Sequence, residues 1–189
     1  MQKRTGAKED GSRTGVRAAD FLALHTRFEF RSIRPEEAAQ TVVLETICFP
    51  PNEVCTEEML LQRVRKAPEM MLIAADRANG RMAGFLSGLA TEEKSFRDEF
   101  FSNAELHEPE GKQVMLLGLN VLPQYRGQGI ARELMLLYCC RAREKKRNAL
   151  ILTCLEDKVE MYQRMGFLDR GISASGWGGE QWHEMHCLL

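Results

Sequence analysis

The residues best suited to chemistry lie in one glycine-containing turn, residues 124–131, between an apolar stretch and an amphipathic one. Gly127 and Gly129 let the backbone approach a ligand closely, because glycine has no Cβ and adopts positive φ readily. The helix expected after the turn starts with backbone N–H groups that have no acceptor within the helix, and its dipole favours an anion there. Arg126 adds a charged hydrogen-bond donor. The turn therefore predicts a site for a phosphate or pyrophosphate group.

Two better-known phosphate-binding patterns do not occur in the sequence. Neither G-x-G-x-x-G, typical of dinucleotide binding, nor G-x-x-x-x-G-K-[ST], typical of nucleotide hydrolases, can be found. A nucleotide hydrolase is therefore disfavoured. Taken alone, the turn also fits an ordinary glycine turn that binds nothing.

Two motifs together resemble the GNAT N-acetyltransferase superfamily. The family pattern Arg/Gln-x-x-Gly-x-Gly/Ala stands here as Arg126-Gly127-Gln128-Gly129-Ile130-Ala131, and the family element Y-x-x-x-G-F stands here as residues 162–167. The apolar strand before the turn also fits the family's splayed strand, where a bulge leaves backbone groups free for pantetheine. The resemblance covers residues 28–189.

This resemblance implies a fold of class α/β (α+β), the GNAT fold. Its mixed, mostly antiparallel sheet has six to seven strands, splayed central strands and about four flanking helices. It implies acetyl-CoA as co-substrate, without a metal, and direct attack of a primary amine on the thioester in a ternary complex. The residues expected to bind acetyl-CoA are Leu119, Asn120, Val121, Arg126, Gly127, Gln128, Gly129, Ile130, Ala131, Arg132 and Tyr162.

A narrower resemblance is to the arylalkylamine (serotonin-type) N-acetyltransferases, which acetylate the primary amine of aromatic ethylamines. It rests on residues 107–111, 159–167 and 184–189. Animal members carry two histidines on the central strand, and the matching positions here are Met115 and Leu117, which cannot accept a proton. This departure weakens the substrate assignment more than the reaction. Polyamine or protein-amine acetylation, a longer acyl donor and a non-catalytic acetyl-CoA-binding module stay open as alternatives.

The reaction needs a proton acceptor, since an alkylammonium has a pKa near 10.4. Glu45, Glu53 and Glu156 are the candidate bases, and each also fits a solvated acid. By resemblance, the Tyr162 hydroxyl assists the leaving thiolate, with a packing tyrosine as the alternative. A backbone N–H of the bulged strand, for which Leu119 is the nearest candidate, polarises the acyl carbonyl.

Four aromatic or imidazole side chains near the C-terminus are further candidates. His183 and His186 are three residues apart in an expected strand, so they point to opposite faces and do not form a zinc site. His183 with Trp182 or Trp177 is a candidate for the border of the acceptor pocket, with structural packing as the alternative. Residues 176–179 are expected to form a hairpin turn that exposes Trp177.

The helices and strands that position these residues are predicted from the spacing of apolar residues and from residues that end helices. Strands are expected at 28–33, 70–75, 82–90, 114–121, 149–153, 167–172 and 181–188, and helices at 35–49, 56–67, 131–142 and 157–165. Residues 91–112 are polar and predict a long loop or short helix. Residues 1–27 predict a flexible basic tail, and residues 28–189 the single catalytic domain.

Composition limits the class of protein further. The 189 residues include 26 basic and 27 acidic ones, a balance that argues against nucleic-acid binding. The sequence has no run of about 20 apolar residues, which excludes a membrane-spanning helix. The first residues lack the apolar core of a signal peptide, so a cytoplasmic location is expected, with the six cysteines as free thiols. The expected partners are acetyl-CoA and a small amine, with no membrane, in a monomer or homodimer.

Overall fold

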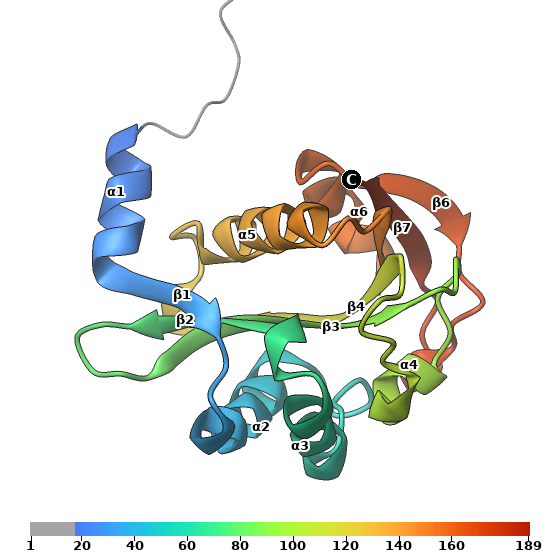
Figure 1. Ribbon diagram of the computed structural model, residues 1–189, viewed down its shortest axis with the longest axis horizontal. Coiled ribbons are helices and arrows are strands. Elements are labelled where there is room, and N and C mark those ends of the chain that lie inside the picture. The colour runs from blue at the N-terminus through green and yellow to red at the C-terminus, as the bar shows by residue number, and fades with distance from the viewer. Residues whose placement is uncertain (1–17) are drawn as a thin grey trace, which may run out of the picture.

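Apolar and half-apolar segments build one sheet of seven strands in the computed structural model, which describes residues 18–189. The strands are β1 (Phe28–Ser32), β2 (Met71–Asp76), β3 (Met82–Thr91), β4 (Gln113–Val121), β5 (Ala149–Cys154), β6 (Leu168–Ile172) and β7 (His183–Leu188). They lie in the order β1-β2-β3-β4-β5-β7-β6 (Figure 1). Only β4 and β5 pair in parallel, and every other neighbouring pair is antiparallel. The predicted mixed, mostly antiparallel sheet is confirmed.

Helices cover both faces of this sheet. Helices α2 (Ala38–Cys48) and α3 (Glu57–Lys66) lie on one face, and α5 (Ile130–Glu144) and α6 (Glu156–Arg164) lie on the other (Figure 1). Because both faces are covered, every residue of β2 and β3 is buried, as expected of central strands. The short α4 (Glu99–Ser102) lies in the long connection between β3 and β4, where the sequence predicts a loop or short helix.

Local signals set the ends of these helices as predicted. The Thr56 hydroxyl accepts a hydrogen bond from the Met59 N–H and caps α3, which ends before Pro68. Helix α2 follows a short 3-10 turn that begins at Pro35, and it ends before Pro50-Pro51. Gly166 has φ +96° directly after the last turn of α6, the conformation that ends many helices.

The central strands β4 and β5 separate along their length. Their pairing covers only residues 113–115 of β4 and 149–151 of β5. On the other edge of β4, Gly88 of β3 faces Leu116 while Ser87 faces Gly118, so Leu117 is the extra residue of a β-bulge. The predicted splayed and bulged strand is therefore present, with its bulge at Leu117. Beyond residue 115, no strand formed by residues 18–189 lies beside the edge of β4 that faces β5.

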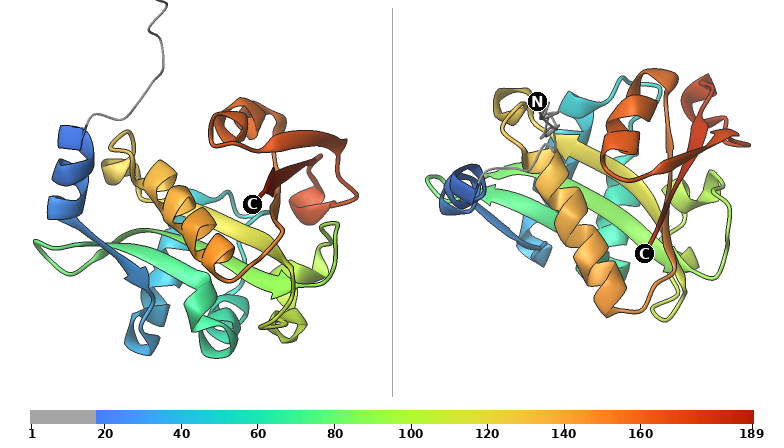
Figure 2. Two further views of the ribbon diagram at one scale, coloured as in Figure 1. Left: turned by 45° about the horizontal axis from the view of Figure 1, so that its top comes forward. Right: turned by 90° about the horizontal axis from the view of Figure 1, so that it is seen from above.

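The N-terminal part of the described chain is not a tail. The sequence predicts a flexible segment over residues 1–27; residues 1–17 lie outside the described residues, and Ala18–Arg27 form the helix α1. The ring of His25 lies 2.8 Å from a carboxylate oxygen of Glu133 on α5, and Leu24 packs against the main core. Helix α1 therefore joins the folded body next to the start of α5 (Figure 2).

Candidate functional site

The turn before α5 has the conformation that an anion site requires. A 3-10 turn, Pro123–Tyr125, follows β4 and leads into Gly127, with φ +74°, and Gly129, with φ +91°. Residues with a Cβ rarely adopt such φ values, so both glycines are required for this path. Gly129 is the N-cap of α5, whose first N–H groups have no acceptor within the helix. These N–H groups and the positive end of the helix dipole therefore meet at one point.

A cavity of about 730 Å³ runs from this turn across the sheet. Its walls come from β4, β5, the first turns of α5, the face of α6 and the loop between α2 and α3. It occupies the space that the separation of β4 and β5 creates. One continuous cavity thus joins the glycine turn to the loops at its far end.

Most of the residues that the sequence assigns to acetyl-CoA line this cavity. They are Leu119, Val121, Arg126, Gly127, Gly129, Ile130, Ala131, Arg132 and Tyr162. Two others do not line it. Asn120 points to the opposite side of β4 and donates from its side-chain amide to Glu45 at 3.1 Å, because neighbouring residues of a strand face opposite ways. Gln128 turns outward, where it accepts a hydrogen bond from Arg27 and donates one to the Gln124 carbonyl.

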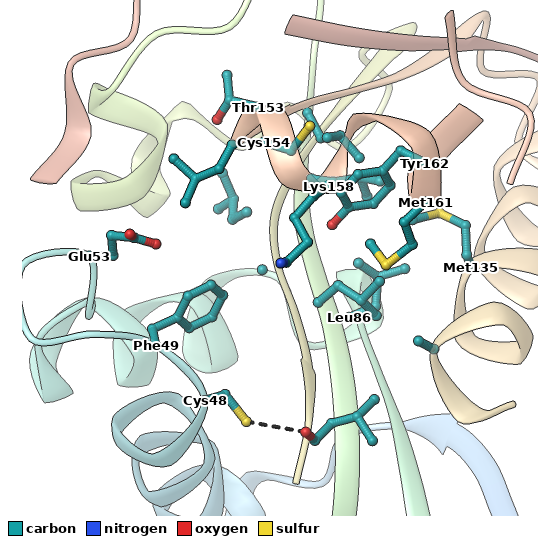
Figure 3. Close-up of a pocket in the computed structure, with 18 of the residues that line it drawn as sticks. Cys48, Phe49, Glu53, Leu86, Met135, Thr153, Cys154, Lys158, Met161 and Tyr162 are labelled. Carbon is teal, nitrogen blue, oxygen red and sulfur yellow. Dashed lines mark hydrogen bonds between the residues drawn. The ribbon is translucent and has the colours of Figure 1, made fainter. Parts of the chain in front are cut away.

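Tyr162 is the aromatic residue that α6 places in the cavity. Its hydroxyl points into the space between the walls (Figure 3). The ring packs edge-on against Phe167, with 5.7 Å between ring centroids, so the side chain is held in place. Burial raises the pKa of the phenol well above its ordinary value, and the phenol therefore stays protonated at neutral pH. The neighbouring Cys154 also stays protonated, because burial and nearby acids raise its pKa to about 12.

Glu53 faces the same cavity from the loop between α2 and α3 (Figure 3). The residue is 9% exposed, and among residues 18–189 no hydrogen bond to its carboxylate is found. Its pKa is raised, first by burial and then by the negative charges of Glu180 and Asp157, while Lys158 opposes the rise. A buried, unpaired carboxylate of this kind can bind a cation or take up a proton.

Glu45 also borders the cavity, but its carboxylate is held from behind. It accepts hydrogen bonds from the Asn120 side chain at 3.1 Å and from the Cys55 N–H at 3.4 Å. Burial raises its pKa, and the positive charge of Arg63 opposes this rise. Beside Glu45, the side-chain oxygen Oδ1 of Asn120 and the Ser87 hydroxyl have no hydrogen-bond partner within the described residues. Groups of this kind are the ones that ordered water satisfies.

Glu156, the third candidate base, lies outside the cavity. It is the first residue of α6, its side chain is exposed, and it does not line the cavity wall. Its position directly after β5 is as expected. The first turn of α6 directs it to solvent, whereas Lys158 faces inward from the same turn.

The far end of the cavity is roofed by the segment between β6 and β7. The Trp177 ring N–H donates to the Glu53 carbonyl at 2.8 Å, and the ring packs on Phe101 with 4.8 Å between centroids. The Asn52 amide donates to the Gly178 carbonyl at 2.9 Å. A Cβ at Gly178 would lie 2.8 Å from the Asn52 carbonyl oxygen, so only glycine allows this approach. The two loops are therefore joined over this far end of the cavity, which is called the acceptor end below.

The three residues expected at the border of the acceptor pocket differ in their positions relative to the cavity. Trp177 and Trp182 line the cavity, whereas His183 pairs with Asp169 at 3.1 Å and does not line it. Trp177 is half-buried, so the expectation that it is exposed is wrong: the ring fills the space between Phe101 and the Glu53 loop. A tryptophan between glycines belongs to no helical or strand pattern, so the sequence does not tell whether its ring is exposed or packed.

Sequence reasoning missed two polar residues of the cavity. Lys158 stands four residues before Tyr162, and this spacing places both on one face of α6, a signal the sequence did contain. The Thr153 hydroxyl, at the end of β5, is buried and has no hydrogen-bond partner within the described residues. The residue itself lies in the cavity wall.

Among residues 18–189, no group of three or more histidine, cysteine, aspartate or glutamate side chains gathers in a way that could hold a metal ion. None of the helices there combines the length and the apolar character needed to cross a membrane.

Comparison with known proteins gives one family match and many similar structures. The model of the "Acetyltransferase (GNAT) family" matches residues 36–167. A curated relative, the "Uncharacterized N-acetyltransferase YkwB" of Bacillus subtilis (strain 168), is 28% identical over 123 residues, which make up 58% of this chain and 54% of the relative. The chain thus spans about half the length of that relative.

Two solved structures share the fold. The loading GNATL domain of CurA from Lyngbya majuscula has a TM-score of 0.72 and 15% identity, covering 85% of this chain and 97% of that domain. The GphF GNAT-like decarboxylase in complex with isobutyryl-CoA has a TM-score of 0.72 and 20% identity, covering 85% of this chain and 98% of the other. At these identities the similarity establishes the fold and leaves the substrate open.

Proposed function

The chain belongs to the acetyltransferase (GNAT) family, and from that premise we propose that it transfers acetyl from acetyl-CoA to the primary amine of a compact acceptor. The observation that carries this proposal is the continuous cavity beside β4 and β5. It connects a glycine turn suited to a pyrophosphate with an end that holds a buried carboxylate and aromatic rings, and the Tyr162 hydroxyl lies along its wall.

The residues present fit acetyl-CoA. The positive φ of Gly127 and Gly129 turns the start of α5 toward the cavity, where its N–H groups suit the pyrophosphate. Arg126 and Arg132 line the same region and add positive charge. The free edge of β4 beyond residue 115 offers backbone groups to pantetheine. Bound there, acetyl-CoA supplies the activated acyl group.

Side chains of the protein then bind the positive charge of the acceptor's ammonium group and accept its proton. Glu53 binds the acceptor's ammonium group and takes its proton, and Glu45 is the alternative base, acting through water held by Asn120 and Ser87. The Leu117 N–H, at the bulge, is our first candidate donor to the acyl oxygen, and the Leu119 N–H is the next. Tyr162, which stays protonated, donates to the departing sulfur.

The shape of the acceptor end favours a small aromatic amine, and an arylalkylamine is our first choice. Phe49, Phe101, Trp177 and Trp182 line that end, and Glu53 supplies the negative charge. An aromatic ring and a cation two or three bonds apart match this pairing. The roof formed by Asn52 and Gly178 argues against an extended peptide. Polyamine acetylation is the alternative within this reaction, and a non-catalytic acetyl-CoA-binding module is the alternative outside it.

The substitution Tyr162→Phe tests the proposal. It removes the hydroxyl and keeps the ring packing on Phe167, so we expect kcat to fall by about tenfold or more while the Kd for acetyl-CoA stays within about twofold. Tyr138→Phe is the matched control, because the Tyr138 hydroxyl is buried and donates to the Met70 carbonyl at 2.9 Å, away from the cavity. The control should lose stability and keep its turnover. Equal turnover of Tyr162→Phe and wild type would favour the binding module.

A further inference from the structure

The cavity already contains a primary amine of the protein itself. Lys158 lies on the face of α6 that carries Tyr162, one helical turn earlier. Figure 3 shows its ammonium group directed into the cavity, between the Glu53 carboxylate and the Tyr162 hydroxyl. The side chain is 52% exposed, and its ammonium group contacts the Asp157 carboxylate. Lys158 therefore extends toward the position proposed for the acceptor amine.

We propose that Lys158 is a self-acetylation site: in the absence of an external amine, its Nζ accepts the acetyl group from bound acetyl-CoA. This inference rests on the proposed function, because it uses the same cofactor and the same groups. The Nζ–carbon bond forms as the carbon–sulfur bond breaks. The products are N-acetyl-Lys158 and free CoA thiol, with the second ammonium proton released through Glu53 to solvent, so no further reactant is needed.

The surroundings of Lys158 favour acetylation of this residue over acetylation of other lysines. An amine held beside a bound thioester reacts as if its concentration were very high, while a surface lysine depends on free acetyl-CoA. Glu53 is a proton acceptor within the same cavity. Lys145 is a suitable comparison, since it is exposed at the C-terminal end of α5 and does not line the cavity.

Asp157 opposes the reaction at Lys158. Its carboxylate contacts the ammonium group, and this ion pair must open before Nζ can reach the acyl carbon. The acetyl group would remove the positive charge of Lys158 and add volume at the acceptor end of the cavity. Acetylated protein should therefore turn over an external amine more slowly than unmodified protein.

Mass spectrometry of the full chain incubated with acetyl-CoA tests the proposal. Acetylation blocks tryptic cleavage after Lys158, so the modified protein yields a joined peptide, residues 148–164, heavier by one acetyl group. We expect this peptide to form about tenfold or more faster than acetyl-Lys145. Excess desulfo-CoA should suppress the reaction at Lys158 and leave that at Lys145 unchanged. An external amine that is a substrate should slow it as well.

Three variants sharpen the result. Asp157→Asn should speed the labelling of Lys158, and Tyr162→Phe should slow it. Lys145→Arg, the control, should leave it unchanged. Labelling of Lys158 at the rate of Lys145, insensitive to desulfo-CoA, would overturn the proposal. If the protein binds acetyl-CoA and acetylates an external amine while Lys158 stays unmodified, only this inference fails. If it does not bind acetyl-CoA, the proposed function fails first.

Discussion

Replacing Glu53 with glutamine separates charge from shape at the acceptor end. The variant Glu53→Gln keeps the size of the side chain and the loop hydrogen bond from Trp177, which uses the Glu53 backbone carbonyl. It removes the negative charge and the ability to accept a proton. The acceptor is an ammonium ion at neutral pH, so the change acts directly on its binding and on its deprotonation.

The size of the effect follows from the position of the carboxylate. An ammonium about 4 Å from a carboxylate gains about 4 kcal/mol at an effective dielectric constant of about 20. Loss of water from both ions offsets part of this gain. Charged hydrogen bonds contribute about 1.5–3 kcal/mol net. A loss of that size corresponds to a fall in kcat/KM of about 10- to 150-fold.

The assay is the release of CoA thiol at neutral pH, measured as kcat/KM for the acceptor, with the Kd for acetyl-CoA followed by calorimetry. The matched control is Glu156→Gln, which makes the same chemical change on the exposed first residue of α6, outside the cavity. The control should stay within about twofold of wild type, since surface changes have small effects. A fall of less than about threefold for Glu53→Gln, with acetyl-CoA binding intact, would refute the role given to Glu53.

Three further changes test the turn, the buried acid and the N-terminal helix. Gly129→Ala and Gly80→Ala both force an alanine into positive φ, and each should lower the free energy of unfolding in urea by about 1–2 kcal/mol. Only Gly129→Ala should weaken acetyl-CoA binding measured by calorimetry. Equal binding of acetyl-CoA by the two variants would contradict the role of the turn. Burial raises the pKa of Glu45, so in the pH range between the ordinary carboxylate pKa and the raised value the folded state binds more protons than the unfolded state. As pH rises through this range, the free energy of unfolding in urea should fall for wild type relative to Glu45→Gln. The same pH dependence for the two proteins would contradict this prediction. His25→Ala removes a side chain that contacts Glu133 at 2.8 Å, so thermal unfolding should show a free energy of unfolding lower by about 1 kcal/mol. An unchanged Tm would mean that α1 adds nothing to stability.

Much of the fold follows from the sequence, because local and long-range signals agree. Pro50-Pro51 and Gly166 mark the ends of helices through their backbone conformation, and Thr56 marks the start of α3 through its side-chain hydroxyl, each as expected. The apolar strands β3 and β4 are buried on both faces, as their composition predicts. Helix α1 was missed because few large apolar residues precede Phe21. Its packing depends on Leu24 and on His25 meeting α5, a contact far apart in sequence.

The candidate site follows from the sequence only where a motif fixes the geometry. Gly127 and Gly129 are required by positive φ, so their placement was predictable. Asn120 was assigned to the cofactor although strand alternation turns it to the other face of β4. Trp177 reaches the cavity through loop packing, which no local pattern encodes, whereas the i, i+4 spacing of Lys158 and Tyr162 is a signal that the sequence contained. The path of the glycine turn was therefore predictable from the sequence, whereas the arrangement of the residues at the acceptor end was identified only from the structure.

The most direct test of the central claim is CoA release from acetyl-CoA with tryptamine, phenylethylamine, spermidine and a lysine peptide, alongside calorimetry of acetyl-CoA binding. The account predicts binding of acetyl-CoA and turnover mainly on the two aromatic amines, because the acceptor end pairs aromatic rings with Glu53 under a closed roof. Turnover mainly on spermidine or the peptide would contradict the acceptor assignment. Tight binding with no turnover on any amine would contradict the claim that this cavity catalyses acetyl transfer to compact amines.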